Sequence, residues 1–197
     1  HFTGNIAADS KSFLEHHGFP KTAVHSKAVA AKARELAIRF GANPDKAEIA
    51  GYLHDISAVF PSAERANIAR ELNIELLPEE DIFPMIIHQK LSVVVAHDLF
   101  SVDDDEVLSA IGCHTTLKFD SSLLDKVVFV ADKIAWDQVG KPPYLDDLLP
   151  ALDKSIDHAA YVYLDYLWQM RASLKVLHPW TKAAHHQLKQ QLNDINR

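Results

Sequence analysis

Cysteine is nearly absent from the sequence, and glycine and long apolar runs are scarce as well. The single cysteine, Cys113, excludes an intrachain disulfide, and this usage agrees with a reducing compartment. No apolar stretch approaches the roughly 18 residues of a membrane span, and residues 1–5 lack the basic and apolar segments of a signal peptide. We therefore expect a cytoplasmic protein with no membrane partner.

Positive charge is also in short supply, because 20 Lys and Arg residues face 27 Asp and Glu residues. The formal net charge of −7 opposes binding to duplex nucleic acid, which requires a basic footprint. A local basic pocket for a small phosphorylated ligand is compatible with this balance. We expect no nucleic-acid partner.

With only six glycines the chain has few breaks, and its apolar residues recur mostly at helical spacing. Gly41 is expected to end one helix, and Asn43 and Pro44 to begin the next. Residues 127–130 resemble a strand, but the run continues without a break and has no partner strand, so we predict a helix. The expected helices cover residues 25–40, 44–54, 61–72, 81–100, 103–112, 121–139, 145–170 and 180–192.

These expectations describe a single all-α domain of 197 residues, which is long enough to bury a sizeable core. Its core is expected over about residues 22–140, with C-terminal helices of about residues 145–192 packed on it.

The most informative short motif is His54-Asp55, which lies at the end of the apolar segment 50–56. An ionised Asp in apolar surroundings is costly unless a cation or hydrogen bonds compensate it. The pair therefore predicts that a cation or hydrogen-bond donors from elsewhere in the chain compensate Asp55. Such pairs also arise by chance, and we interpret the second one, His97-Asp98, as a surface feature because it lies near the acidic residues 103–105.

Four further residues can complete a metal site with this pair, namely His25, His88, His114 and Asp132. Each alone is weak evidence, since a lone His on a helix more often packs in the core or lies on the surface. Asp132 carries more weight, because a buried carboxylate commonly has a charged partner or a metal. Lys133 is not the expected partner, since neighbours in sequence point to different faces of a helix.

Imidazole and carboxylate ligands suit divalent iron, manganese, cobalt, nickel or zinc, and the lack of thiolates argues against a structural zinc site. Four protein ligands on an octahedral ion leave positions for water and a phosphoryl oxygen. The sequence has no Walker-type phosphate loop and no Gly-x-Ser-x-Gly elbow. Cys113 beside His114 is a weak candidate for thiol chemistry, and the adjacent histidines at 16–17 and 185–186 are expected on the surface.

The ordered set of candidate ligands resembles the HD-domain metal-dependent phosphohydrolase superfamily. That set is His25, His54, Asp55, His88, His114 and Asp132. Residues 110–116, 124–134 and 177–181 are similar to the YqeK-type symmetrical bis(5'-nucleosyl)-tetraphosphatases, and the likeness runs from about residue 22 to 188. The resemblance implies a compact helical bundle, the HD domain.

The resemblance also implies roles for individual residues and a reaction. The implied metal ligands are His25, His54, Asp55 and Asp132. The implied catalytic residues are Asp55, His88 and His114. The implied substrate contacts are His88, His114, Ser57 and His178. The ion expected first is iron, with manganese, cobalt, nickel, zinc and magnesium as alternatives, and His88 and His114 approach either the phosphates or a second metal. The implied reaction splits a dinucleoside tetraphosphate into two nucleoside diphosphates.

Four positions depart from the family pattern. They are Thr22 and Gln138, where Arg is usual, Ala58, where Lys is usual, and Gln89, where Gly is usual. Arg offers a bidentate fork for phosphate that Thr and Gln lack, so polyphosphate recognition is expected to weaken. The lysines that can compensate are Lys90, Lys118, Lys133 and Lys141.

Two functions therefore stay open. The leading hypothesis is a metal-dependent phosphohydrolase that cleaves a phosphoanhydride or phosphoester bond of a nucleotide or dinucleotide. The second is a catalytically weak nucleotide-binding sensor or regulatory protein. A purely structural helical protein leaves Asp55 and Asp132 unexplained. The aromatic segment 161–168 allows a homodimer, although such a segment is more often internal core.

Overall fold

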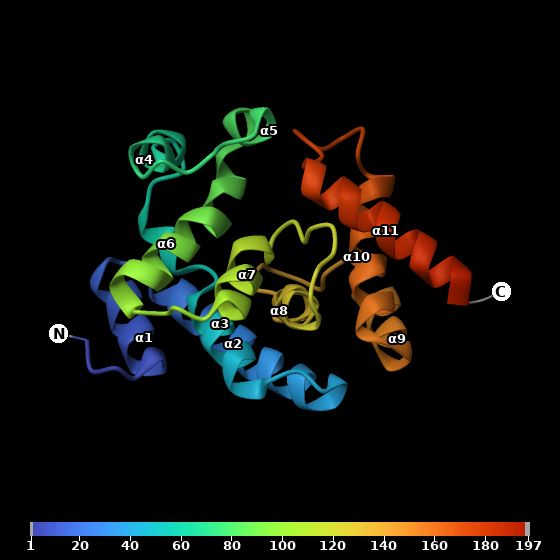
Figure 1. Ribbon diagram of the computed structural model, residues 1–197, viewed down its shortest axis with the longest axis horizontal. Coiled ribbons are helices and arrows are strands. Elements are labelled where there is room, and N and C mark those ends of the chain that lie inside the picture. Colours follow the sequence, from blue (N-terminus) through green and yellow to red (C-terminus); the bar gives the residue numbers. More distant parts are fainter. Residues whose placement is uncertain (1, 196–197) are drawn as a thin grey trace.

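The computed structural model describes residues 2–195 and, within them, consists of helices without strands (Figure 1). The elements in chain order are α1 (Ile6–His16), α2 (Pro20–Phe40), α3 (Pro44–Leu53), η1 (Ile56–Val59), α4 (Arg65–Glu71), α5 (Pro78–Ile82), η2 (Pro84–Ile87), α6 (His88–Phe100), α7 (Asp105–Cys113), α8 (Leu123–Ile134), α9 (Leu145–Lys154), α10 (Ile156–Gln169) and α11 (Pro179–Ile195). The prediction of an all-α fold is confirmed. Among these helices, none is both long and apolar enough to cross a membrane.

Helix α8 lies between the N-terminal helices and the C-terminal group α9–α11 (Figure 1). It contacts α2, α3, α7 and α10, and residues 127–131 are fully buried. A helix covered on all sides is apolar all round, which explains why this run resembles a strand in the sequence. Ser122 and Asp125 form a capping box at its start, and their mutual bonds measure 3.0 and 2.8 Å. The helix predicted here is confirmed, although it ends at Ile134 rather than near residue 139.

Helices α2 and α3 pack unusually closely because Gly51 has no side chain. A Cβ atom at Gly51 would lie 2.5 Å from Ala30 Cα and 2.7 Å from Ala30 N. As predicted, Gly41 ends α2 in the left-handed conformation, with φ 82°, and Asn43 caps α3 through its side chain. The crossing brings the end of α3 against the middle of α2.

Helix α1 was not among the predicted helices, because the signals that define it are polar contacts within the first residues. Asn5 caps the helix by accepting from Ala8 N at 3.0 Å. The Asp9 carboxylate accepts from Thr3 N and Gly4 N, each through Oδ2, at 2.8 and 2.9 Å. These bonds tie the chain before α1 to its first turns.

Two predicted helices are each broken, and the prediction of continuous helices is wrong there. The segment 81–100 divides into the end of α5, then η2 and α6, because Pro84 cannot continue the helical hydrogen-bond ladder. The segment 145–170 divides at Ser155, which is extended and caps α10 by accepting from His158 N at 3.1 Å. The first break matters for function, since α6 begins at His88.

The aromatic segment 161–168 packs partly against the core. In α10, the Tyr163 ring lies 5.5 Å from Phe129 of α8 and 4.7 Å from Tyr144, and Leu164 is fully buried. Homodimerisation and the division of the chain into a core and added C-terminal helices remain predictions.

We expect Gly51→Ala to lower the free energy of unfolding by about 1–3 kcal/mol, because the new methyl group overlaps the backbone of Ala30. The measurement is denaturant unfolding followed by circular dichroism. Gly112→Ala in α7 is the matched control, since its Cβ would meet only the Val93 Cγ2 atom, at 3.0 Å. Equal stability of the two variants would show that the approach of α2 and α3 does not require glycine.

Candidate metal centre

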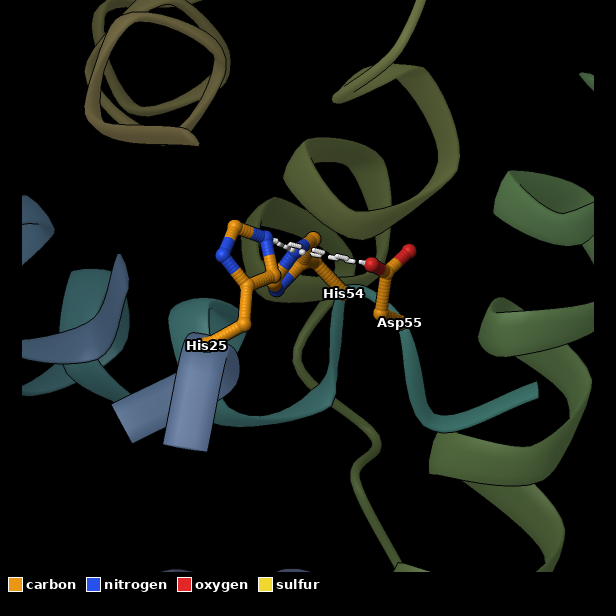
Figure 2. A group of neighbouring side chains, drawn as sticks. All are labelled: His25, His54 and Asp55. Carbon is orange, nitrogen blue, oxygen red and sulfur yellow. Dashed lines mark hydrogen bonds and ion pairs between the residues drawn. The ribbon is translucent and has the colours of Figure 1, made fainter. Parts of the chain in front are cut away.

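The predicted ligands come together from five helices at the centre of the fold. His25 lies within α2, His54 and Asp55 directly follow α3, His88 begins α6, His114 directly follows α7, and Asp132 lies in α8. Figure 2 shows the imidazoles of His25 and His54 and the Asp55 carboxylate pointing toward one another.

The Asp55 carboxylate lies between two pairs of histidines. Its Oδ2 atom is 3.4 Å from His54 Nε2 and 4.0 Å from His25 Nε2. Its Oδ1 atom is 3.3 Å from His88 Nε2 and 3.4 Å from His114 Nε2. Asp55 therefore belongs to two clusters, one with His25 and His54 and one with His88 and His114. In each cluster the possible ligand atoms lie within 4.8 Å of one another, so either cluster is small enough to surround one cation.

Asp132 joins the cluster of His25 and His54. Its Oδ1 atom is 3.1 Å from His25 Nε2 and 3.6 Å from His54 Nε2. Its Oδ2 atom accepts from Lys133 Nζ at 2.5 Å, which corrects the expectation that Lys133 is not a partner. Although the two residues are neighbours on α8, the flexible lysine side chain returns to the carboxylate and also donates to His114 O at 3.1 Å.

Three of the four histidines are oriented by the same local contact. In each, Nδ1 faces the backbone carbonyl three residues earlier, and a carbonyl can only accept, so Nδ1 carries the proton. The pairs are His54 with Gly51 (2.8 Å), His88 with Met85 (2.6 Å) and His114 with Ile111 (2.8 Å). The last carbonyls of a helix lack helical partners, which makes them available to the residue that follows. The contact leaves each Nε2 lone pair directed at the centre, as a metal ligand requires.

Burial and charge shift the pKa values of the ligands strongly. Burial opposes a charge on His54, but Asp55 and Asp132 outweigh it and raise the His54 pKa to about 10. Burial lowers the pKa of His114 to about 4, and the neighbouring His54 and His88 add to this effect against the opposing bond to Asp55. The histidines in turn hold the pKa of Asp55 well below its usual range despite its burial. Two ionised carboxylates at the centre thus require compensating positive charge, which a cation can supply in place of protons.

A cavity of about 330 Å³ opens onto the two clusters. His25, Asp55, His88, His114 and Asp132 line it, whereas His54 is fully buried behind them. Aromatic side chains complete the wall, namely Trp136, Tyr144 and Tyr163. The donor set is therefore formed of imidazole nitrogens and carboxylate oxygens at the base of an accessible cavity, which fits a divalent metal ion.

Of the four lysines expected to compensate for missing arginines, only Lys133 lines this cavity. Lys90 donates to Glu80, Lys118 to Ser109, and Lys141 to Asp146. Gln138, one of the positions that depart from the family pattern, does line the cavity.

Ser57 and His178 do not reach the cavity. Ser57 is fully buried, and its hydroxyl donates to His88 O at 2.8 Å, so it holds the backbone of a ligand. His178 is buried beside Glu80, with 3.3 Å between Nε2 and Oε1. Their positions do not support the predicted substrate contacts of these two residues.

Within residues 2–195, the remaining histidines and Cys113 lie outside the centre. His97 is exposed and pairs with Asp98 at 2.6 Å, in agreement with a surface feature. Burial raises the pKa of the Cys113 thiol, which argues against thiol chemistry. The surface prediction is wrong for His185, which is 1% exposed because its ring stacks on Trp168 at 4.8 Å.

Gln89 has a structural role that the sequence did not reveal. Its fully buried side chain accepts from Thr115 N at 3.2 Å and donates to Thr116 Oγ1 at 3.1 Å. Gln89 therefore joins the residue after His88 to the residues after His114, and the Nε2 atoms of these two histidines lie 3.0 Å apart. From the sequence alone, Gln89 was visible only as a departure from glycine.

Helices that converge on clustered His and Asp side chains define a helical protein with a candidate divalent-metal site. Residues 22–137 match the family model of the HD domain, and the chain belongs to the HD-domain family. The His/Asp cluster is consistent with the divalent-metal site of such a domain.

Two known proteins are similar in sequence to more than half of this chain. An uncharacterized protein of Lactococcus lactis subsp. cremoris, encoded in the pepC 5' region, is 45% identical over 148 residues, which is 75% of each chain. The symmetrical bis(5'-nucleosyl)-tetraphosphatase of Bacillus subtilis strain 168 is 38% identical over 113 residues, 56% of this chain and 59% of that relative. This match spans less than two thirds of the tetraphosphatase.

A solved structure agrees with the fold over nearly the whole chain. The crystal structure of a predicted HD superfamily hydrolase involved in NAD metabolism, from Clostridium acetobutylicum, superposes with a TM-score of 0.85 at 26% identity. It covers 93% of this chain and 97% of that one. Family, relatives and site together define an HD-superfamily phosphohydrolase with a His/Asp metal site.

We expect Gln89→Ala to lower the free energy of unfolding by about 1–3 kcal/mol, because it leaves the half-buried Thr115 N–H without its acceptor and removes the buried donor to Thr116 Oγ1. It should also weaken Mn²⁺ binding, since the contact between the His88 and His114 segments is lost. Unfolding in urea and equilibrium dialysis with Mn²⁺ measure the two effects. Gln169→Ala, at an exposed position, should change neither. Wild-type Mn²⁺ affinity in Gln89→Ala would contradict the positioning role.

Proposed function

We propose that the protein is a metal-dependent phosphohydrolase that cleaves a phosphoanhydride bond of a nucleotide, with symmetrical dinucleoside tetraphosphates as the first candidate substrates. The observation that carries this proposal is the position of Asp55, whose two carboxylate oxygens face two separate histidine pairs. Such a carboxylate is suited to holding positive charge at the base of a phosphate-binding cavity.

In this proposal the residues divide into two groups. His25, His54, Asp55 and Asp132 hold one divalent ion, for which iron is the first candidate and manganese, cobalt, nickel, zinc and magnesium are alternatives. His88 and His114 would either contact the phosphate directly or, together with Asp55, hold a second ion. A bound divalent ion supplies Lewis-acid activation of a phosphoryl oxygen and lowers the pKa of bound water.

The protein groups around the cavity then have defined tasks. His88, whose Nε2 also lies 3.1 Å from Thr115 Oγ1, and His114 present Nε2 lone pairs to the cavity. They would therefore reach a phosphate through a cation that they ligate, or by donating from Nε2 in the imidazolium form. Lys133 places an ammonium group beside Asp132 at the cavity wall. Water adds to one of the two central phosphorus atoms, and the bridge between these two atoms breaks. The hydroxyl of the water stays on the attacked phosphorus and its proton passes to the departing phosphate oxygen or to solvent, so two nucleoside diphosphates form.

Two observations favour different functions. Over 113 residues, the tetraphosphatases of Bacillus subtilis and Halalkalibacterium halodurans are 38% and 32% identical to this chain, which favours a dinucleoside tetraphosphate. Thr22, Ala58 and Gln138 remove positive charges that the resemblance leads one to expect, which favours the second candidate, a nucleotide-binding sensor of low activity.

We expect Asp132→Ala to reduce hydrolysis by more than about 100-fold and to reduce bound metal, because the variant removes a carboxylate 3.1 Å from His25 Nε2. The measurement is metal analysis of anaerobically purified protein coupled to a hydrolysis screen of dinucleoside polyphosphates, nucleotides and phosphate monoesters. Asp98→Ala, at the exposed pair, is the matched control and should retain both properties.

Full activity of Asp132→Ala with unchanged metal content would overturn the assignment of the metal site. Binding of nucleotides by the wild-type protein without turnover, across several divalent metals, would instead favour the sensor.

A further inference from the structure

A second and larger cavity, of about 580 Å³, lies between the start of α2 and the residues that follow α8. Its volume falls within the range of small-molecule sites. It shares His25, Trp136 and Asp137 with the cavity of the metal centre, so the two cavities adjoin along one wall. A ligand whose phosphates lie at the metal centre can therefore extend into the second cavity.

The remaining lining of this cavity is mainly apolar. Pro20, Val24, Ala28, Ile134 and Ala135 contribute it, and Lys21 adds the only cationic side chain other than histidine among the residues that line it. Such a surface suits a flat, weakly polar ring better than a chain of phosphates, which requires several cations. The metal centre and Lys133 lie on the other side of the shared wall.

The shared wall has an aromatic face and unused polar atoms. Trp136 is only partly buried, and the Tyr144 ring holds it from one side at 6.1 Å and 83°. Both Trp136 Nε1 and His25 Nδ1 are buried without a hydrogen-bond partner among the described residues. Such atoms are costly unless water or a ligand satisfies them.

Three other cavities, between 370 and 490 Å³, share no residue with the metal-centre cavity. One lies between α1 and α2, one beside the N-terminal residues, and one on α11. Unlike these three, the cavity beside Trp136 is placed to receive the part of a substrate that extends from the metal centre.

We propose that this second cavity binds one nucleoside of the substrate, with its base stacked on Trp136 and its phosphates directed past His25 to the metal centre. This inference rests on the proposed function, because it assumes that the metal centre receives the phosphates of a nucleotide. Asp137, at the shared wall, can accept hydrogen bonds from ribose hydroxyls but repels phosphate, which agrees with this orientation.

The test fills the cavity without disturbing the core. Ala28 is exposed on α2 and lines the cavity, so Ala28→Trp should occupy the base site and leave folding intact. We expect binding of adenosine diphosphate in the presence of Mn²⁺ to weaken by about tenfold or more, as for the loss of one stacked base. Inorganic pyrophosphate, which has no nucleoside, should bind as to the wild type. Trp136→Ala should show the same selective loss.

Ala31→Trp is the matched control, since Ala31 is also exposed on α2 but does not line the cavity. It should bind both ligands with wild-type affinity, as measured by equilibrium dialysis. Unchanged affinity of Ala28→Trp for adenosine diphosphate would overturn the inference, as would equal weakening of both ligands, because that result would indicate damage to the metal centre.

The two proposals can fail separately. Normal hydrolysis of the tetraphosphate by Ala28→Trp would contradict the proposed nucleoside site and would leave the proposed phosphohydrolase activity supported. The opposite result is also distinguishable. If Ala28→Trp selectively loses adenosine diphosphate binding while the wild type hydrolyses none of the screened substrates, the nucleoside site is supported and the enzymatic function is contradicted.

Discussion

The Asp55 carboxylate is the group on which the rest of this structure depends. A buried negative charge is costly without compensation, and here two histidine pairs from four helical elements surround its two oxygens. Asp132 adds a second carboxylate, and Lys133 balances part of its charge. The helices are therefore arranged around an electrostatic centre as well as an apolar core, and α8 contributes to both.

Helix ends explain how the fold orients its ligands. Three histidines follow the last turn of a helical segment and use a carbonyl that the helix leaves unpaired. Backbone geometry thus sets the imidazole orientation, and any shift of these helices also moves the site. Gly51 illustrates the link, because the same residue lets α3 approach α2 and supplies the carbonyl that orients His54.

The chemistry of the site is better defined than its substrate. The metal ligands need only a few convergent atoms, whereas a polyphosphate needs several cations along its length. In this chain Lys133 is the lysine that reaches the metal-centre cavity, and Gln138 stands where the resemblance leads one to expect arginine. Under the proposed function, affinity for a nucleotide would come more from the metal centre and from apolar or aromatic surface, such as that beside Trp136.

The sequence by itself determined the helical fold, because helical periodicity and caps such as Asn43 are local features. It also determined the candidate ligands, because the order and spacing of the His and Asp residues resemble a known family. Only the tertiary structure decided which side chains meet. His25 and Asp132 are 107 positions apart, and the roles of Gln89 and Ser57 depend on contacts between separate helices. Local patterns record the preference of each segment for helix, whereas contacts between segments arise when all the helices pack around one centre.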